Sequence, residues 1–198
     1  MERTREMSKE PELDWIVNPV AGLSLSEMEN NVHIIYPYLY KKGWKKQAIK
    51  AVCGWMEYLS TINPAYTSQD SFGNPTIGLL TWLEAAGVSA DGNSQLDFLD
   101  ETIDSNAYWT SNPNAEPTKP PITGREWVET EDIMDEVSYV LFGWYYLGRE
   151  MNYFERAEVL INVQYWSVFI DELPEPEDDS KKKKRKKWIY YMKPQWKM

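Results

Sequence analysis

Apolar side chains recur every three or four residues over much of this chain, which is the spacing of one face of an α-helix. The first such segment begins near Ser24 or Ser26, where Ser26 and Glu29 have the spacing of a capping box. Pro37 lies inside this segment and removes one helical hydrogen bond, so we expect a kinked helix that ends at Gly43. Its apolar face is expected to hold Val32, Ile35, Tyr36 and Leu39.

A second helix is predicted from residue 45 to residue 60. Asn63-Pro64 stops it, because the residue before a proline disfavours helical backbone. With the turn at Gly43, the two segments predict a helical hairpin. The apolar face of the second helix is expected to hold Ile49, Val52, Cys53 and Met56.

The later elements follow the same pattern, interrupted by loops. Residues 65–76 are rich in Ser, Asn, Gly and Pro and are expected to form a loop, followed by a short apolar segment over 77–86. Ser94 and Asp97 are expected to cap a helix that ends near residue 106. A loop over 110–124 and helices over 130–147 and 152–169 complete a mainly α body with no convincing strand pattern. Two apolar faces are predicted here: Leu96, Leu99 and Ile103 on the earlier helix, and Phe154, Ala157, Ile161, Tyr165, Val168 and Phe169 on the last one.

Charge divides the chain more sharply than hydropathy. The 198 residues carry a net charge of -10, but residues 181–198 contain nine basic and no acidic residues, whereas residues 171–180 contain six acidic and no basic ones. We therefore expect an N-terminal extension over 1–23, a helical domain over 24–170, an acidic proline-containing hinge over 171–180 and a basic aromatic tail over 181–198. Trp15, Ile16 and Val17 in the extension are expected to dock on a partner.

The chain has one cysteine, Cys53, and one histidine, His33, which excludes an internal disulfide and a Cys/His zinc site. Any catalytic imidazole would have to be His33, which we expect to be a partly buried polar residue, while Cys53 is expected to be a small core side chain. Neither a cofactor nor a metal is expected. Residues 1–13 lack the apolar stretch of about 7 to 15 residues of a secretory signal, and no membrane span is expected because no apolar run reaches about 20 residues.

Several short motifs occur in a particular order. Residues 43–49 read Gly-Trp-Lys-Lys-Gln-Ala-Ile, residues 54–64 read Gly-Trp-Met-Glu-Tyr-Leu-Ser-Thr-Ile-Asn-Pro, and residues 78–82 read Gly-Leu-Leu-Thr-Trp. With the lead-in Leu25-Ser26-Glu27-Met28, they resemble the lysozyme-like domain of phage tail-tip lysins, enzymes that open peptidoglycan during DNA entry. The resemblance covers roughly residues 24–169 and implies a lysozyme-like helical fold, an association with the virion and peptidoglycan as substrate.

The position that carries the chemistry departs from that family. The resemblance places the general-acid glutamate immediately before the Ser of the Ser-Thr-Ile-Asn-Pro motif, where this chain has Leu59. A leucine cannot protonate a glycosidic oxygen. Glu57 is a weak surrogate, because two residues along a helix correspond to a rotation of roughly 200°. Trp55 and Thr81 replace the family's Asn and Gln, and Tyr145–Arg149 lacks the Glu of its Tyr-Glu-Arg-Pro segment.

Aromatic side chains can stack on sugar rings, so loss of the acid need not remove glycan binding. The candidates for a retained glycan-binding site are Trp55, Tyr58, Tyr66 and Thr81, whereas Trp44 and Trp82 are expected to pack in the core. Glu57, Asp70 and Glu84 are the acids nearest this region in the sequence, and we interpret them as surface carboxylates rather than an acid and base pair.

The tail is a candidate site for an acidic partner or a polyanion. Its charge argument fits DNA, teichoic acid and an acidic neighbour in an assembly equally well, and the resemblance favours the last. The residues concerned are Lys181, Lys182, Lys183, Lys184, Arg185, Lys186, Lys187 and Trp188.

Together these features predict a virion-associated phage protein, made in the host cytoplasm, that contacts other virion proteins. Its lysozyme-like domain is expected to be degenerate and non-catalytic, with a structural or glycan-binding role. Two alternatives stay open: an active peptidoglycan-degrading glycosidase that uses a relocated acid, and an internal virion protein that binds DNA through its tail alone.

Overall fold

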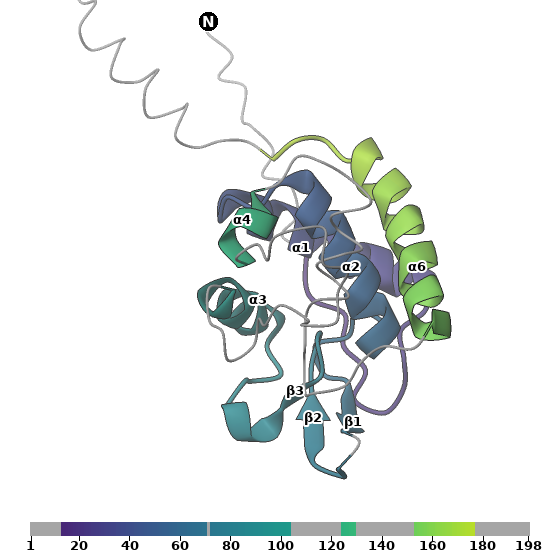
Figure 1. Cartoon of the computed structure of the whole chain (residues 1–198), viewed down its shortest axis with the longest axis vertical. Helices are drawn as coiled ribbons and strands as arrows, with labels where there is room; N and C mark the ends of the chain where they lie inside the picture. The colour runs from purple at the N-terminus through teal and green to yellow at the C-terminus, as the bar shows by residue number, and fades with distance from the viewer. Residues whose placement is uncertain (1–12, 71, 104–123, 130–152, 177–198) are drawn as a thin grey trace, which may run out of the picture.

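The computed structural model describes residues 13–70, 72–103, 124–129 and 153–176. This part of the chain is mostly helical with a small antiparallel sheet, which confirms the mainly α prediction. Figure 1 shows α2 between α6 on one side and α3 and α4 on the other, with the sheet beyond the end of α2. The elements are α1 (Leu25–Lys41), α2 (Lys46–Ser60), β1 (Thr67–Gln69), β2 (Pro75–Ile77), β3 (Trp82–Leu83), the 3-10 turn η1 (Glu84–Ala86), α3 (Gly92–Thr102), α4 (Gly124–Val128) and α6 (Tyr153–Glu172).

The helical hairpin forms as predicted, with one difference at the start of α1. Its N-cap is Ser24, whose backbone N–H and hydroxyl both donate to the Glu27 carboxylate at 2.7 and 2.6 Å, so the expected pair Ser26 and Glu29 is wrong. The helix runs through Pro37 as expected, because loss of one hydrogen bond does not end a helix whose neighbouring side chains are buried, and the kink expected there stays a prediction. Gly43 makes the turn to α2 with φ +97°, a conformation that favours glycine.

The sheet is a correction to the expected loop over 65–76. β1 pairs antiparallel with β2, which pairs antiparallel with β3, and Thr76 lies opposite both Ser68 and Leu83. Strands of two or three residues are too short for an alternating pattern to emerge, so the sequence reads as turn-rich loop. The sheet follows directly from the end of α2, where Thr61 and Ile62 both adopt φ +53°.

Residues 13–23 form part of the body instead of a separate extension. The Asn31 side chain bonds both backbone groups of Ile16 at 2.8 Å, and the Asn63 amide donates to the Asn18 carbonyl at 2.6 Å. Trp15 and Ile16 are partly buried and pack against the core of their own chain, and their expected docking on a partner stays a prediction. Val17 stays exposed.

The last helix turns a different face to the core from the one predicted. Its buried side chains are Val159, Val163, Trp166 and Ile170. Of the expected face, Phe154, Ile161, Tyr165 and Val168 are exposed. Apolar residues lie all round α6, so periodicity alone does not determine which face is covered.

Two boundaries also shift. α6 continues to Glu172, two residues into the expected hinge, and Asp171 accepts a hydrogen bond from Lys50 at 2.7 Å. α3 is capped by Asp91, which accepts from the Ser94 N–H at 2.7 Å, so the expected caps Ser94 and Asp97 are wrong. The helix predicted over 130–147, most of the loop over 110–124 and the tail lie outside the described residues.

Large aromatic side chains fill the core around α2. Trp44, Trp82, Trp127 and Trp166 are fully buried, which confirms the expected core positions of Trp44 and Trp82. The Trp44 indole N–H donates to Asp100 at 2.8 Å, so burial leaves this polar group bonded. The helices that the structure describes include none with the length and hydropathy needed to cross a bilayer.

Candidate functional site

The end of α2 holds the position to which the sequence resemblance assigns a general acid. Leu59 occupies that position, half-buried and packed against the core. Its side chain has no group that can donate a proton. The chemistry of this site therefore depends on the carboxylates nearby, of which Glu57 is the nearest in sequence.

Glu57 faces α6, and two residues along a helix separate it from Leu59 by a rotation of roughly 200°. Its carboxylate accepts a hydrogen bond from the Trp166 indole N–H at 2.7 Å. Burial raises the pKa of Glu57, the bond from Trp166 opposes that rise, and the nearby charge of Glu158 adds to it. Gly54, one turn earlier, lies against Val163 of the same helix, and Lys50 reaches Asp171. Lys50, Gly54 and Glu57 thus lie on the α6-contacting face of α2.

The motif residues that follow Leu59 connect the end of α2 to the sheet. The Ser60 hydroxyl lies 2.9 Å from both the Met56 and the Leu79 carbonyls, and Asn63 bonds the N-terminal segment through Asn18 and Ala21. These side chains are buried and use their polar atoms on the backbone. Their role in this structure is to fix the conformation of the chain.

Gln95 of α3 is a further buried member of this network that sequence reasoning missed. Its side-chain oxygen accepts from the Leu79 N–H at 2.8 Å, and its amide nitrogen donates to the carbonyls of Pro64 and Ser89 at 2.7 and 2.8 Å. Gly78 packs so closely on it that a side chain there would collide with the amide. A single glutamine in an amphipathic helix gives no signal of this role, because its partners are distant in the sequence.

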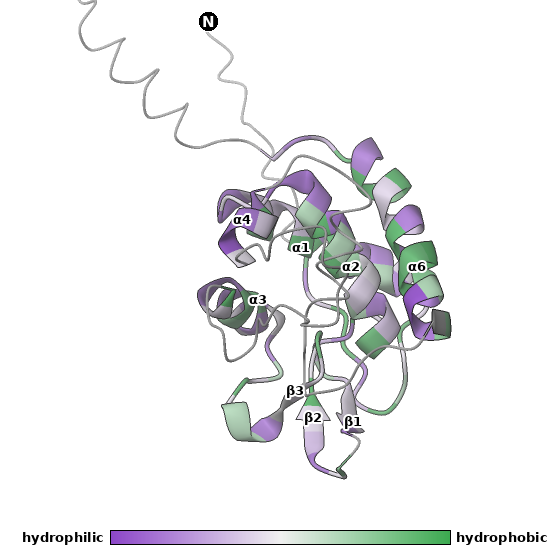
Figure 2. Cartoon of the chain, in the orientation of Figure 1, coloured by the Kyte–Doolittle hydropathy of each residue, from purple (hydrophilic) through white to green (hydrophobic). Residues whose placement is uncertain are grey.

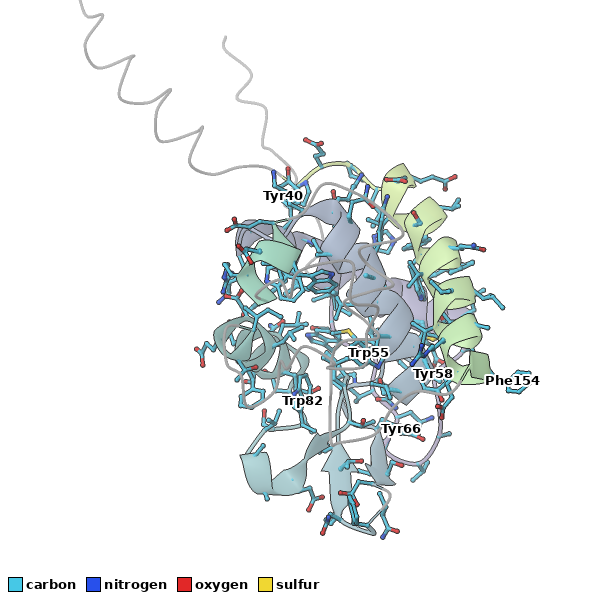
Figure 3. All side chains as sticks on the ribbon, viewed as in Figure 1. Tyr40, Trp55, Tyr58, Tyr66, Trp82 and Phe154 are labelled. Atoms are coloured by element: carbon cyan, nitrogen blue, oxygen red, sulfur yellow. The ribbon has the colours of Figure 1, made fainter. Side chains whose placement is uncertain are left out.

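The structure separates the four glycan-binding candidates. Trp55 is only 4% exposed, so its ring packs in the core and offers no open face to a sugar, which corrects its place among the candidates. Tyr58, Tyr66 and Thr81 are half-buried. Tyr66 and Thr81 meet at Gly78, whose N–H donates to the Tyr66 carbonyl at 2.8 Å and whose carbonyl accepts from Thr81 at 3.0 Å. Figure 3 shows Tyr58 on the last turns of α2 and Tyr66 at the start of the sheet region.

The other candidate acids have different surroundings. Asp70 accepts bonds from the Asn74 amide and from the backbone N–H groups of Phe72 and Asn74, all at 2.8 Å. The Asn74 side-chain bond is the main reason that the pKa of Asp70 is lowered, so Asp70 orders the β1–β2 loop and is unsuited to act as a general acid. Glu84 is exposed in η1.

The single histidine and the single cysteine have different surroundings. His33 is exposed, not partly buried as expected, and its ring meets Phe169 edge-on with centroids 5.4 Å apart. Cys53 is fully buried, as expected, and burial raises the pKa of its thiol. Within the described part of the chain no three His, Cys, Asp or Glu side chains are grouped closely enough to hold a metal ion. The basic residues 181–187 and Trp188 lie outside that part.

Comparison with known proteins links the chain to a phage. No protein-family model matches it. Over 158 residues it is 28% identical to Morphogenesis protein 1 of Bacillus phage B103, a match that covers 74% of this chain and 40% of that protein. This chain therefore spans less than half the length of that relative, and the similarity is to a phage protein without assigning a family.

Proposed function

We propose that this chain is a structural protein of a phage particle whose lysozyme-like body has lost glycosidase chemistry. The proposal rests on two positions at the end of α2: Leu59 stands where the sequence resemblance requires the acid, and Glu57 is bonded to Trp166 of α6. The similarity to a protein named for phage morphogenesis supports a role in the particle.

The chemistry of glycoside hydrolysis explains why these two positions matter. A lysozyme-type enzyme protonates the leaving oxygen with a carboxylic acid whose pKa is raised by its surroundings. Burial does raise the pKa of Glu57, but its carboxylate lies at the interface of α2 and α6, on a different face of α2 from Leu59. A raised pKa alone therefore does not make Glu57 a replacement acid.

A zymogram with peptidoglycan tests the loss of chemistry. We expect no clearing from the full-length protein, and none from Glu57→Gln. Leu59→Glu asks whether the acid alone restores activity, and we expect it to remain inactive because Trp55 and Thr81 also depart from the family pattern. Clearing by the natural chain that disappears in Glu57→Gln would show an active enzyme with a relocated acid.

The particle role needs a separate measurement. We expect the protein in gradient-purified particles of the phage that encodes it, detected by mass spectrometry, at a copy number that stays constant from one preparation to the next. Its presence in infected cells but absence from particles would contradict a structural role.

Glycan binding without cleavage is the second candidate role. The backbones of Tyr66 and Thr81 are both hydrogen-bonded to Gly78, and Tyr58, Tyr66 and Thr81 are each partly exposed. Co-sedimentation with insoluble peptidoglycan is the test. We expect Tyr58→Ala and Tyr66→Ala to weaken binding several-fold if this role is retained. Phe72→Ala, at an exposed aromatic of the β1–β2 loop, is the control. Equal binding by all three variants would exclude these tyrosines.

A further inference from the structure

The outward face of α6 carries an apolar stripe that the described part of the chain leaves largely open. Ile161 and Val168 are 65% and 64% exposed, and Tyr165 lies between them at 38%. A surface helix usually has one apolar face toward the core and a charged face toward water. α6 instead alternates hydrophobic and hydrophilic residues along its whole length (Figure 2), although its other face is already buried against α2.

Acidic side chains lie at both ends of this stripe. Residues 158, 161, 165, 168 and 172 follow one another at helical spacing, so Glu158 and Glu172 flank the three apolar positions, and both are exposed. Glu29 of α1 borders the same face, since its carboxylate accepts from the Tyr165 hydroxyl at 2.6 Å. We call residues 158, 161, 165, 168 and 172 of α6 the outer stripe. An apolar centre with acidic ends complements a segment that combines aromatic and basic residues.

Such a segment follows α6 in the same chain. Residues 181–187 are seven consecutive basic residues, followed by Trp188, Tyr190, Tyr191 and Trp196. The 22 residues from 177 to 198 can extend over roughly 70 Å. α6 has 20 residues and is only about 30 Å long, so this segment can reach every position of the outer stripe.

We propose that the tail, residues 181–198, folds back along the outer stripe of α6 in its own chain. The basic run lies at the C-terminal end of α6, beside Glu172 and the helix carbonyls, where positive charge is favoured. The aromatic side chains that follow cover Val168, Tyr165 and Ile161, and Lys193 reaches the Glu158 end. The acidic partner of the tail is then the chain's own last helix.

Two other occupants fit the stripe less well. Residues 130–152 contain five acidic residues and one arginine, so they carry the same sign of charge as the ends of the stripe. A second copy packed antiparallel on the stripe would place Glu158 beside Glu172 of its partner. Three apolar side chains also offer far less area than the roughly 1,200 Å² that a stable pair of proteins buries.

Disulfide trapping in the full-length protein tests the proposal. Gln164→Cys places a thiol at the exposed edge of the stripe, and Tyr190→Cys places its partner in the tail. The matched control joins Tyr190→Cys to Ser68→Cys, an exposed position on β1. Cys53 is buried, so we expect it to form no disulfide with the introduced thiols. We call Gln164→Cys with Tyr190→Cys the stripe pair, and Ser68→Cys with Tyr190→Cys the control pair. We expect the stripe pair to form an intramolecular disulfide about tenfold faster than the control pair, because docking raises the local thiol concentration.

The gel pattern separates the outcomes. Equal rates for both pairs would overturn the proposal, and so would a disulfide found only in a dimer band, which would show that a second copy supplies the tail. Rapid trapping in the monomer, slowed by 1 M NaCl where the screening length is about 3 Å, supports it.

A second set of variants tests the contact surface itself. Ile161→Ser with Val168→Ser, added to the stripe pair, removes two exposed apolar side chains and leaves the buried face of α6 unchanged. We expect trapping to slow to the control rate. Val20→Ser, at an exposed apolar residue outside the stripe, should leave the rate unchanged. A stripe pair that traps equally fast without Ile161 and Val168 would overturn the proposal.

Discussion

Buried amide side chains hold distant parts of the chain together. Asn31, Asn63 and Gln95 are fully buried, and each bonds backbone groups from a segment far away in the sequence. A buried amide is tolerated only when its donors and acceptors find partners, so each of these residues fixes the position of the segment that it bonds. Of the three, only Asn63 belongs to the motif over residues 54–64, and in this structure its amide serves the fold.

Gln95→Met tests this role, because methionine matches the shape of glutamine and has no amide. The change leaves the Leu79 N–H and the carbonyls of Pro64 and Ser89 without their partner. We expect the free energy of unfolding in urea to fall by about 3 kcal/mol. Gln164→Met, at an exposed position, should change it by less than about 0.5 kcal/mol. Similar values for the two variants would contradict the role of Gln95.

Glu57 gives the stability a particular pH dependence. Because burial raises its pKa, the folded protein binds this proton more tightly than the unfolded chain does. The unfavourable contribution of Glu57 is absent below the unfolded value of about 4.3 and grows as the pH rises through the raised folded value. Above that window it is fully present.

We therefore expect Glu57→Gln, which retains an acceptor for Trp166, to stabilise the protein by up to about 1 kcal/mol at pH 7. The gain should vanish near pH 4. Thermal unfolding between pH 4 and pH 8 measures it, with Glu84→Gln as the exposed control. A constant gain over that range, or a loss at pH 7, would show that ionisation of Glu57 carries no penalty.

At the scale of elements, the contact between α2 and α6 organises the fold. It includes the Glu57–Trp166 hydrogen bond, the Lys50–Asp171 ion pair and a close approach at Gly54. A side chain at Gly54 would meet both the side chain and the backbone of Val163. The absence of a Cβ on α2 is what brings the two helices this close.

Gly54→Ala should destabilise the protein, although alanine favours an isolated helix by about 1 kcal/mol over glycine. Overpacking at Val163 outweighs that preference, and we expect a net loss of about 2 kcal/mol in urea unfolding. Val163→Ala in the Gly54→Ala background should recover only part of the loss, because the backbone of Val163 remains in the way. Full recovery in this double-mutant cycle would locate the clash in the side chain alone.

Elements with strong local signals could be predicted from the sequence, whereas pairings between distant segments could not. The positions of α1 and α2 and the buried face of α1 followed from periodicity and from the turn and stop signals around them. α2 is buried on all sides over residues 48–56, so periodicity identified only part of its buried set. The strands are too short to show a period, and α6 is apolar on both faces, so its orientation depends on Gly54 in another helix. At the candidate site, the leucine at position 59 could be recognised from the sequence. The burial of Trp55 and the hydrogen bond between Glu57 and Trp166 could not, because they depend on contacts between segments that are distant in the sequence.

At the scale of the whole molecule, the segment from residue 13 to residue 23 crosses three elements and joins them. Trp15 donates to Asn93 at the start of α3, Ile16 is bonded by Asn31 of α1, and Leu23 donates to Thr61 at the end of α2. The segment has no strand or helix of its own, so its backbone amides depend on side chains of the body. It acts as a strap over the helical hairpin.

This dependence predicts that the strap opens cooperatively. Asn31→Ala removes the acceptor of the Ile16 N–H and a donor to the Ile62 carbonyl, so the strap loses its central attachment. In hydrogen exchange we expect the amides of Ile16, Asn18 and Leu23 to lose protection together, by at least about tenfold, because local opening of a contiguous segment exposes all its amides at once. Asn74→Ala, which removes a bond within the β1–β2 loop, should leave these three amides unchanged. Loss of protection at Ile16 alone would show instead that each attachment holds independently, and that residues 13–23 are pinned point by point without forming one unit.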